Sequence, residues 1–484
     1  MKSHGLMLLA GLAAAASATA GPESSLPVVR LPAAYGAATS ALTPAALDRW
    51  WILFDDPELN ALEAEASTNA SDARTAAARI LEARATRAAQ KARTLPSGSI
   101  SGKAGRDEAY QLGVAGNDLN PTSGVTDAVS GGLNLSWELD LFGRLAVARR
   151  VADANAAEAR FNVEGTRSSL AAEVADTYFQ AVGLTAQAVD AHETVRIRKD
   201  LLAVAARRNS AGAGPADDVD RAAGEAAQAE AQAAGIEGQL EVARRALLIL
   251  VGRPLDAPDD LRLAGLPPEA PRPPKVVPAE LLTRRPDVRE AEYRFRSELG
   301  GARLAHLAVF PTITLLPGLG LSSTRSPGVS YIPPSTLVST QQTNTTGFWS
   351  LAAGISAPVL DIPRLLQEAR AEDARSRQAA IVYERTVRTA FGEAQNALTS
   401  LEAGSRSTAL LVEGESRSEH AFEGARRRYA QGLGDLTAML SAEQSWRSIH
   451  SALTSERIDT LRRAVRTYKA LGGGWASASA GSGF

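Results

Sequence analysis

The 484-residue sequence contains no cysteine, few aromatic residues and almost no net charge. Without cysteine there is no disulfide bond, no zinc–thiolate site and no thiol nucleophile. The net charge of −2 argues against a nucleic-acid-binding protein, which is usually basic. Aromatic residues make up 5% of the chain, a small share for a large globular core. We therefore expect helix packing or assembly to stabilise the protein.

Long apolar runs are also lacking after the N-terminus, where no segment reaches the ~18 residues of a transmembrane helix. The first 20 residues, by contrast, are typical of an export signal. Lys2 supplies a positive charge, residues 6–16 are apolar, and Ala18-Thr19-Ala20 fits a cleavage site. We expect residues 1–20 to be a signal peptide and the chain to be exported.

Proline is absent between Pro121 and Pro215 and again after Pro363. The alanine- and arginine-rich residues 144–208 and 364–429 within these gaps predict two long helices. At 1.5 Å per residue, each helix would be roughly 100 Å long. That length predicts a coiled coil or a tube rather than one compact domain.

The two halves of the chain resemble each other. "RRNSAGAGPADDV" and "RRYAQGLGDLTAM" begin at residues 207 and 427, and their glycine pairs share this offset of 220. Each pair predicts a helix–helix turn, because glycine accepts positive φ. The predicted organisation is a signal peptide (1–20), an extended segment (21–56), a first repeat (57–251), a Pro-rich linker (252–278), a second repeat (279–471) and a disordered tail (472–484). Each repeat is predicted to contain a helix, a β-hairpin (about 97–141 or about 311–360), a long helix and a second helix (216–251 or 436–471).

Residues 131–141 alternate between apolar and polar side chains, which predicts a strand with two different faces. The apolar positions are Leu133, Leu135, Trp137, Leu139 and Leu141, and the polar positions are Asn134, Ser136, Glu138 and Asp140. A soluble sheet packed on helices would produce this alternation, and so would a membrane strand. The export signal, the repeated hairpins and the long helices favour contact with lipid. Since one chain offers too few strands for a membrane barrel, several chains would have to contribute.

Enzymatic chemistry has little support. The five histidines are too scattered for a metal motif, and "GSISGKA" at Gly98 is too short for a phosphate-binding loop. A coiled-coil scaffold would explain the helices but not the alternating strands. No cofactor is predicted.

Eight motifs in order over nearly the whole chain resemble the TolC-like outer-membrane efflux family, in its OprM/NodT branch. They are "GPE…LP" (21–27), "WWILFDDPELNAL" (50–62), "WELDLFGRL" (137–145), "LILVGRP" (248–254), "LLTRRPDVREAEYRFR" (281–296), "FPTITL" (310–315), "APVLDIPRL" (357–365) and "RRYAQGLGDL" (427–436). The resemblance implies an α+β membrane protein. Three chains would share a 12-stranded outer-membrane β-barrel above a long periplasmic α-helical barrel.

The family exports small toxic compounds or drugs with a periplasmic adaptor protein and an inner-membrane pump, which we expect to be of the RND type. Secretion of a protein by a type I system is the alternative. The resemblance places the five apolar residues of 133–141 against outer-membrane lipid. The periplasmic tip that docks the adaptor would comprise Arg208, Gly212, Gly214, Arg428, Gly432 and Gly434.

The resting gate is expected near the same tip, with Tyr429, Asp435, Asp217 and Asp218 as candidate residues. Three-fold symmetry would turn each inward-facing acid into a ring of charge. Helix capping by the acids is the simpler alternative. Ser441 and Gln444 stand where the family commonly has an aspartate and an arginine, so the gate differs from that pattern. Many relatives carry a lipid on an N-terminal cysteine, which this sequence lacks, so we expect no lipid anchor.

Overall fold

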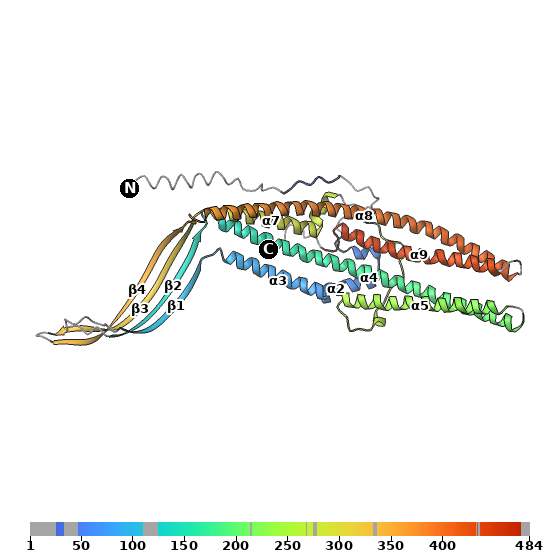
Figure 1. Cartoon of the computed structure of the whole chain (residues 1–484), viewed down its shortest axis with the longest axis horizontal. Coiled ribbons are helices and arrows are strands. Elements are labelled where there is room, and N and C mark those ends of the chain that lie inside the picture. Colours follow the sequence, from blue (N-terminus) through green and yellow to red (C-terminus); the bar gives the residue numbers. More distant parts are fainter. Residues whose placement is uncertain are drawn as a thin grey trace. The chain divides into compact units, whose positions relative to one another are not determined.

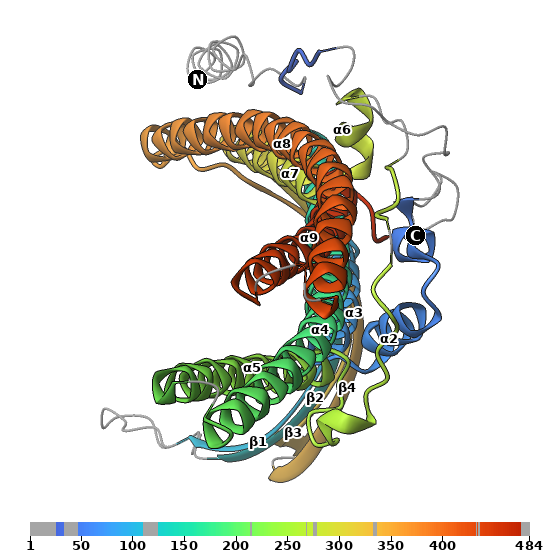
Figure 2. The same cartoon turned by 90° about the vertical axis from the view of Figure 1, so that its right-hand side faces the viewer.

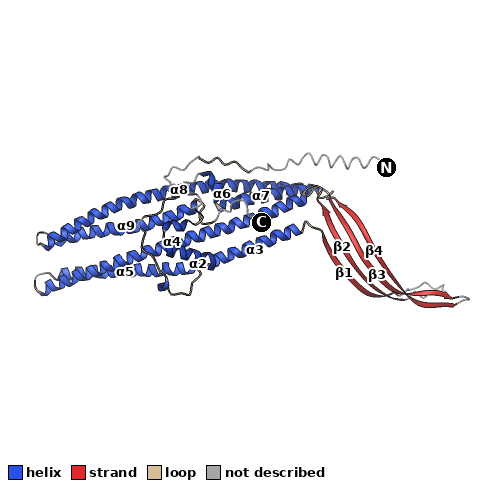
Figure 3. Cartoon of the chain, turned by 180° about the vertical axis from the view of Figure 1, so that it is seen from behind, coloured by secondary structure: helices blue, strands red, loops and turns tan. Residues whose placement is uncertain are grey.

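The structure is a computed structural model of the chain that describes residues 26–32, 47–109, 124–212, 215–267, 269–273, 278–332, 336–431, 433 and 436–475. The chain divides into two compact units. The strand unit contains Arg84–Ala156 and Phe295–Ala379, and the helical unit contains Leu26–Ala83, Ala157–Arg294 and Ala380–Phe484. Helices predominate among the described residues, and the strands form one sheet (Figure 3).

The strand unit carries an antiparallel sheet in the order β1-β2-β3-β4 (Figure 1). The strands are β1 (Ser97–Ala109), β2 (Gly124–Leu139), β3 (Thr312–Ile332) and β4 (Thr336–Ser356). Each predicted hairpin supplies two neighbouring strands, and β2 pairs with β3 to join the hairpins. The order leaves β1 and β4 at the edges of the sheet.

Pro317 lies inside β3, where proline is normally excluded because it cannot donate a ladder hydrogen bond. Its strand stays paired with β4, where Pro317 lies opposite Leu351. On the other side, the pairing of β3 with β2 is interrupted at Pro317 and Leu316 and resumes at Leu315. The missing N–H is therefore accommodated on the β2 side, without a break in the strand.

The described helices follow the repeat. They are α2 (Pro57–Asn69), α3 (Ser71–Ala92), α4 (Arg144–Ser210), α5 (Ala216–Leu250), α6 (Leu281–Arg284), α7 (Pro286–Leu307), α8 (Ile362–Ala430) and α9 (Leu436–Ala470), with 3₁₀ turns η2 (Trp50–Phe54), η3 (Pro258–Asp260) and η4 (Pro278–Glu280). The helix expected first in each repeat is thus divided, into α2 and α3 in the first half and into α6 and α7 in the second. The segment expected to be extended over 21–56 contains η2.

Each long helix has a shorter companion in the helical unit: α5 lies beside α4, and α9 lies beside α8 (Figure 2). Helix α9 also contacts α4 closely. A Cβ atom at Gly183 of α4 would lie 2.3 Å from the Ile458 side chain of α9, so a larger residue would require Ile458 to move. Arg462 of α9 donates to both oxygens of Asp176 in α4, at 3.0 and 2.7 Å. Backbone proximity and a bidentate ion pair therefore join the two repeats.

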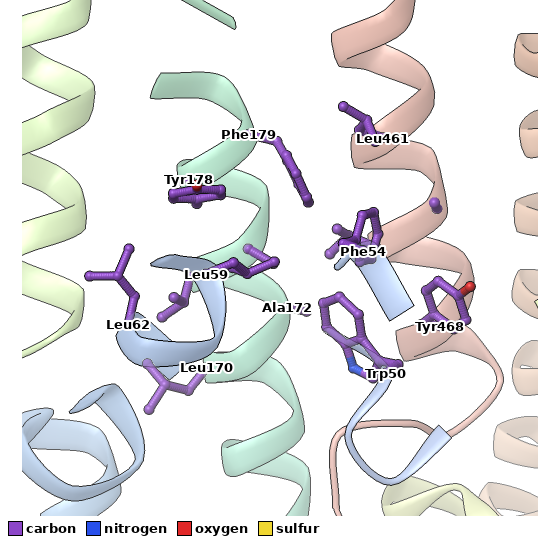
Figure 4. Close-up of a cluster of buried hydrophobic side chains, with 14 of the residues drawn as sticks. Trp50, Phe54, Leu59, Leu62, Leu170, Ala172, Tyr178, Phe179, Leu461 and Tyr468 are labelled. Carbon is purple, nitrogen blue, oxygen red and sulfur yellow. The ribbon is translucent and has the colours of Figure 1, made fainter. Parts of the chain in front are cut away.

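The main hydrophobic cluster draws on η2, α2, α3, α4, α5, α6, α8 and α9, and Figure 4 shows part of it. Trp50 is fully buried and stacks on Tyr468, with ring centroids 5.5 Å apart. Phe54 packs against Phe179 at 4.8 Å. Aromatic side chains from η2, α4 and α9 thus pack together in this cluster.

Asp56 is a buried polar residue in this cluster. Its Oδ1 accepts hydrogen bonds from the backbone N–H groups of Glu58 and Leu59 and so caps α2. Its Oδ2 accepts the Tyr178 hydroxyl at 2.7 Å. Burial raises the pKa of Tyr178, and the bond to Asp56 raises it further. The hydroxyl therefore stays protonated and ties α4 to the start of α2.

Residues 26–32 are assigned neither helix nor strand and lie over a second cluster in the helical unit. Leu26, Val29 and Leu31 pack against buried Val288, Tyr383 and Val387. This segment therefore lies on α7 and α8 through its own apolar side chains.

Glu63 is the buried acid whose titration should most affect stability. It is 4% exposed, and burial raises its pKa well above the ordinary value. Its stability contribution is greatest below the ordinary carboxyl pKa, because Glu63 is then protonated in both the folded and the unfolded chain. As pH rises, the unfolded chain ionises first, and the free energy of unfolding falls.

We expect Glu63→Gln to raise the free energy of unfolding at pH 8 by roughly 1–3 kcal/mol and to have less effect at pH 4. Thermal unfolding in detergent at the two pH values measures this difference. Glu65→Gln is the matched control, because Glu65 lies on the same helix and contacts Arg253 at 3.7 Å. An equal gain from both variants would contradict the assignment to burial.

Candidate functional site

The sheet has one apolar and one polar face. Residues directly opposite each other on antiparallel strands project from the same face. Leu133 lies opposite Ile100 in β1 and Leu319 in β3, and Leu319 lies opposite Trp349 in β4. The neighbouring apolar rows are Trp137–Leu315–Ala353 and Leu139–Ile313–Ile355. The alternation in β2 is thus repeated across the sheet.

This apolar face is exposed in the chain. Ile100 is 87% exposed, Trp349 79% and Leu351 66%, whereas side chains packed against a helix layer would be buried. Leu135 and Trp137 in the middle of the sheet are also exposed. The alternative of a soluble sheet packed on helices is therefore wrong for the described residues.

The opposite face carries mostly small polar side chains. Its rows are Ser99–Asn134–Gly318–Ser350, Ser101–Gly132–Gly320–Phe348 and Ser97–Ser136. Leu316 and Phe348 are its large apolar residues among the described side chains of the sheet. Apart from these two, the face is suited to water.

Charged groups mark both ends of the apolar face. At one end, Arg106 of β1 donates to both carboxylate oxygens of Asp127 in β2, at 2.6 and 2.9 Å. Arg325 of β3 lies opposite Asp127 in the register. Near the other end, Arg144 of α4 forms an ion pair with Glu138 on the polar face. The apolar band therefore runs from Val129 to Leu139 in β2.

The last two positions of the predicted alternation do not belong to the strand. Leu141 lies beyond the end of β2, although it is exposed. Asp140 accepts hydrogen bonds from the backbone N–H groups of Leu145 and Ala146, both at 2.9 Å, and so caps α4. The prediction that these two residues lie on the faces of the strand is therefore wrong. The strand ends before Asp140 because its carboxylate satisfies the first free amides of the helix.

The first predicted tip turn follows the end of α4. Gly212 has φ +68°, the left-handed conformation that favours glycine, and its N–H donates to the carbonyl of Asn209 at 2.9 Å. Arg208 lies in α4, but its side chain is outside the described set. Gly214 lies outside the described residues.

The second predicted tip turn follows the end of α8. Arg428 is exposed in the last turn of that helix, and its carbonyl accepts the N–H of Leu433 at 2.8 Å. Leu433 is 75% exposed, although it is apolar. Three predicted residues, Gly432, Gly434 and Asp435, lie outside the described residues, as does the side chain of Tyr429.

Asp217 and Asp218 lie exposed in the first turn of α5. Pro215 occupies the capping position, and no side chain caps this helix. The two carboxylates are therefore not the predicted caps, although negative charge is still favourable near a helix N-terminus. Whether either acid faces a pore depends on neighbouring chains.

His450 forms a contact that the sequence did not predict. Its Nδ1 lies 3.1 Å from Glu415 of α8, and its Nε2 lies 3.4 Å from Asp190 of α4. Trp446, one turn earlier in α9, donates to the same Glu415 at 3.3 Å. Both long helices, α4 and α8, thus contact α9 at the His450 imidazole. The imidazole can donate to both carboxylates only when it is protonated.

Two features of the described part of the chain concern metal sites and membrane-spanning helices. Its His, Asp and Glu side chains form no group of three or more able to hold a metal ion. None of its helices combines the length and the hydrophobicity needed to cross a bilayer.

Comparison with known proteins identifies the class. The model of the family named outer membrane efflux protein matches residues 62–253 and 277–473, one stretch in each repeat. The chain therefore belongs to this family. The pyoverdine export outer membrane protein OpmQ of Pseudomonas aeruginosa is 27% identical over 433 residues, covering 89% of this chain and 88% of OpmQ. The probable outer membrane lipoprotein SilC of Salmonella typhimurium is 26% identical over 461 residues, covering 94% of this chain and 95% of SilC.

Solved structures confirm the TolC-like fold. The outer-membrane channel OprN superposes with a TM-score of 0.74 at 28% identity, covering 93% of this chain and 99% of that one. The CmeC outer membrane channel of Campylobacter jejuni has a TM-score of 0.78 at 20% identity, with 95% and 96% covered. The predicted family and fold are thus confirmed, and the enzyme alternative is set aside because the family consists of efflux channels.

Proposed function

We propose that this protein is the outer-membrane channel of a tripartite efflux system that exports small toxic compounds. Three chains would contribute four strands each to a 12-stranded barrel, while their long helices form a periplasmic tube. A periplasmic adaptor and an inner-membrane pump, which we expect to be of the RND type, would complete the pathway. The family supports the channel, and the two-faced sheet supports the membrane assignment.

The observation that carries the proposal is the exposed apolar band. From Val129 to Leu139 it covers about ten residue steps, or roughly 34 Å along the strand at ~3.4 Å each. A strand tilt of about 45° reduces this to roughly 24 Å of height, close to the ~25 Å apolar band of outer-membrane barrels. Lipid is therefore the natural partner of Leu133, Leu135, Trp137 and Leu139. The opposite face would line a water-filled lumen.

The open edges of the sheet support assembly with further chains, and the family resemblance supports three. Strands β1 and β4 each leave a row of backbone groups without a partner strand among the residues that the structure describes. A bilayer does not tolerate open edges, and four strands cannot close into a membrane barrel. Pairing β4 of one chain with β1 of the next would satisfy both edges. The sequence has no cysteine to carry a lipid anchor, so the barrel would hold the protein in the membrane.

Fractionation and mass measurement test this proposal. We expect the protein to remain in outer membranes washed with high salt, to dissolve in detergent and to have the mass of three chains. Release by salt as a monomer would contradict it. Deletion of the gene should raise sensitivity to small toxic compounds. Loss of a secreted protein with unchanged sensitivity would instead favour the type I secretion alternative.

The two helix turns near Gly212 and Arg428 are proposed as the tip that docks the adaptor, with the gate close by. Gly214, Gly432 and Gly434 would complete these turns. Asp217, Asp218, Tyr429 and Asp435 remain gate candidates. Arg428 is the best residue to test, because its side chain is exposed and its replacement should leave the fold intact.

We expect Arg428→Glu to reduce drug resistance toward that of the deletion strain while the trimer level stays normal, because charge reversal would repel a complementary adaptor surface. Resistance assays with quantified outer-membrane trimer measure this. Arg388→Glu is the control: Arg388 is 71% exposed and lies earlier on α8. Full resistance in Arg428→Glu, or equal loss in both variants, would contradict the tip assignment.

A further inference from the structure

A cavity of about 500 Å³ lies in the helical unit beside η2 and α2. Trp51 and Ile52 of η2, Leu170 of α4 and several alanine residues give it apolar walls. Asn60 and Glu63 of α2 also line it. Its volume is in the range of small-molecule sites, and apolar walls with few polar groups are typical of such sites.

Two polar atoms of residues that line this cavity have no hydrogen-bond partner among the described residues. Glu63 is 4% exposed, and its buried Oε1 has no hydrogen-bond partner among the described residues. The buried Oδ1 of Asn60 has none either. The two residues are three positions apart, so they lie on the same face of α2. Such groups are costly to bury unless a ligand or water satisfies them.

The chemistry of these groups defines the ligand. A carboxylate and an amide oxygen both accept hydrogen bonds, so a ligand that fits them must carry a donor. Beside a buried carboxylate, a positively charged donor forms the stronger bond. The apolar walls call for a hydrocarbon body. Arg49 and Arg167 also line the cavity, but both are exposed, and Arg167 lies 3.5 Å from Glu164. Their positive charges oppose every cationic ligand, and they oppose a polycation more than a ligand with a single positive group.

We propose that this cavity binds a monovalent organic ammonium ion, with its N–H groups on Glu63 and Asn60 and its hydrocarbon body against Trp51 and Leu170. Burial raises the pKa of Glu63, so the empty cavity favours the protonated form of this carboxyl group over the carboxylate. Binding of the cation favours the carboxylate, and the displaced proton passes to solvent. Release of this proton distinguishes the site from a merely apolar cavity. The proposal does not depend on channel function.

Calorimetry on the full-length protein in non-ionic detergent tests this proposal, with hexylammonium chloride as the probe. Titrations at pH 7 in two buffers with different protonation enthalpies measure the proton release. We expect saturable binding at one site per chain and a binding heat that differs between the buffers. Hexan-1-ol, which has the same hydrocarbon body without the charge, should release no proton. Titration into detergent alone provides the blank.

Two variants locate the binding. Glu63→Gln should weaken hexylammonium binding about tenfold or more and abolish proton release, while the protein stays folded. Glu65→Gln, on the same helix but outside the cavity lining, should bind as the unmodified protein does. Equal affinity in Glu63→Gln, binding without proton release, or no saturable binding would each overturn the proposal. Because these readouts concern binding alone, they are separate from any failure of the efflux proposal.

Discussion

Leu135→Arg is expected to destabilise the inserted barrel by roughly 2–4 kcal/mol, since a charge on the lipid face costs most near the bilayer midplane. Leu135 lies near the middle of the apolar band that runs from Val129 to Leu139. It is 36% exposed and lies opposite Gly98 in β1. The expected result is a marked loss of folded trimer from the outer membrane, measured by fractionation and by resistance of the trimer to unfolding in detergent.

Asn134→Arg is the matched control for this prediction. Asn134 is the preceding residue of β2, at nearly the same depth, but it projects from the opposite face beside Gly318. In a water-filled lumen an arginine there stays hydrated, so insertion should be close to normal. Equal damage from the two variants would show that the faces are assigned wrongly. Damage from Asn134→Arg alone would reverse the assignment.

The two-faced sheet was predictable where the amino-acid pattern is strict. Alternation in β2 indicated which residues share a face, and the described register extends that face to Ile100, Leu319 and Trp349. The prediction is wrong at Asp140, because a capping carboxylate continues the polar alternation after the strand has ended. A period of two alone does not separate a strand residue from a helix cap.

The outer bounds of β3 and β4 were not predicted from the sequence. A hairpin was predicted over about 311–360 without strand bounds inside it, and β3 continues to Ile332 while β4 begins at Thr336. Gln342, Thr343 and Asn344 are all polar, so they show no alternation between apolar and polar side chains. Beyond the apolar band both faces of a strand can be polar, so hydrophobic periodicity carries no signal there.

Residues whose contacts or burial arise only from tertiary packing could not be identified from the sequence. The contact of His450 with Glu415 and Asp190 joins three helices that are distant in sequence. The burial of Glu63 in a polar-looking segment of α2 likewise arises only when η2 and α4 pack around it. The proposed gate depends on contacts among three chains, so its residues stay predictions.

Trp50→Ala is expected to have the largest effect on stability, a loss of about 3–5 kcal/mol. Trp50 is fully buried at the junction of η2 with the long helices. Its ring stacks on Tyr468 with planes 5° apart and meets Phe54 edge-on at 6.0 Å. Truncation would remove these ring contacts and leave a cavity that the rigid long helices cannot close. Thermal unfolding of the trimer in detergent measures the loss.

Trp51→Ala supplies the comparison, because it removes the same atoms from the next residue. Trp51 is only partly buried, packs at the edge of the main cluster and lines a cavity that is already open. Its truncation should therefore lower the unfolding temperature much less than that of Trp50. Similar losses would show that the stability of this region depends on the aromatic content of η2 as a whole. A much larger loss for Trp50→Ala would show that the stability of this region depends on the stack of Trp50 with Tyr468. This stack joins η2 to the last helix of the second repeat.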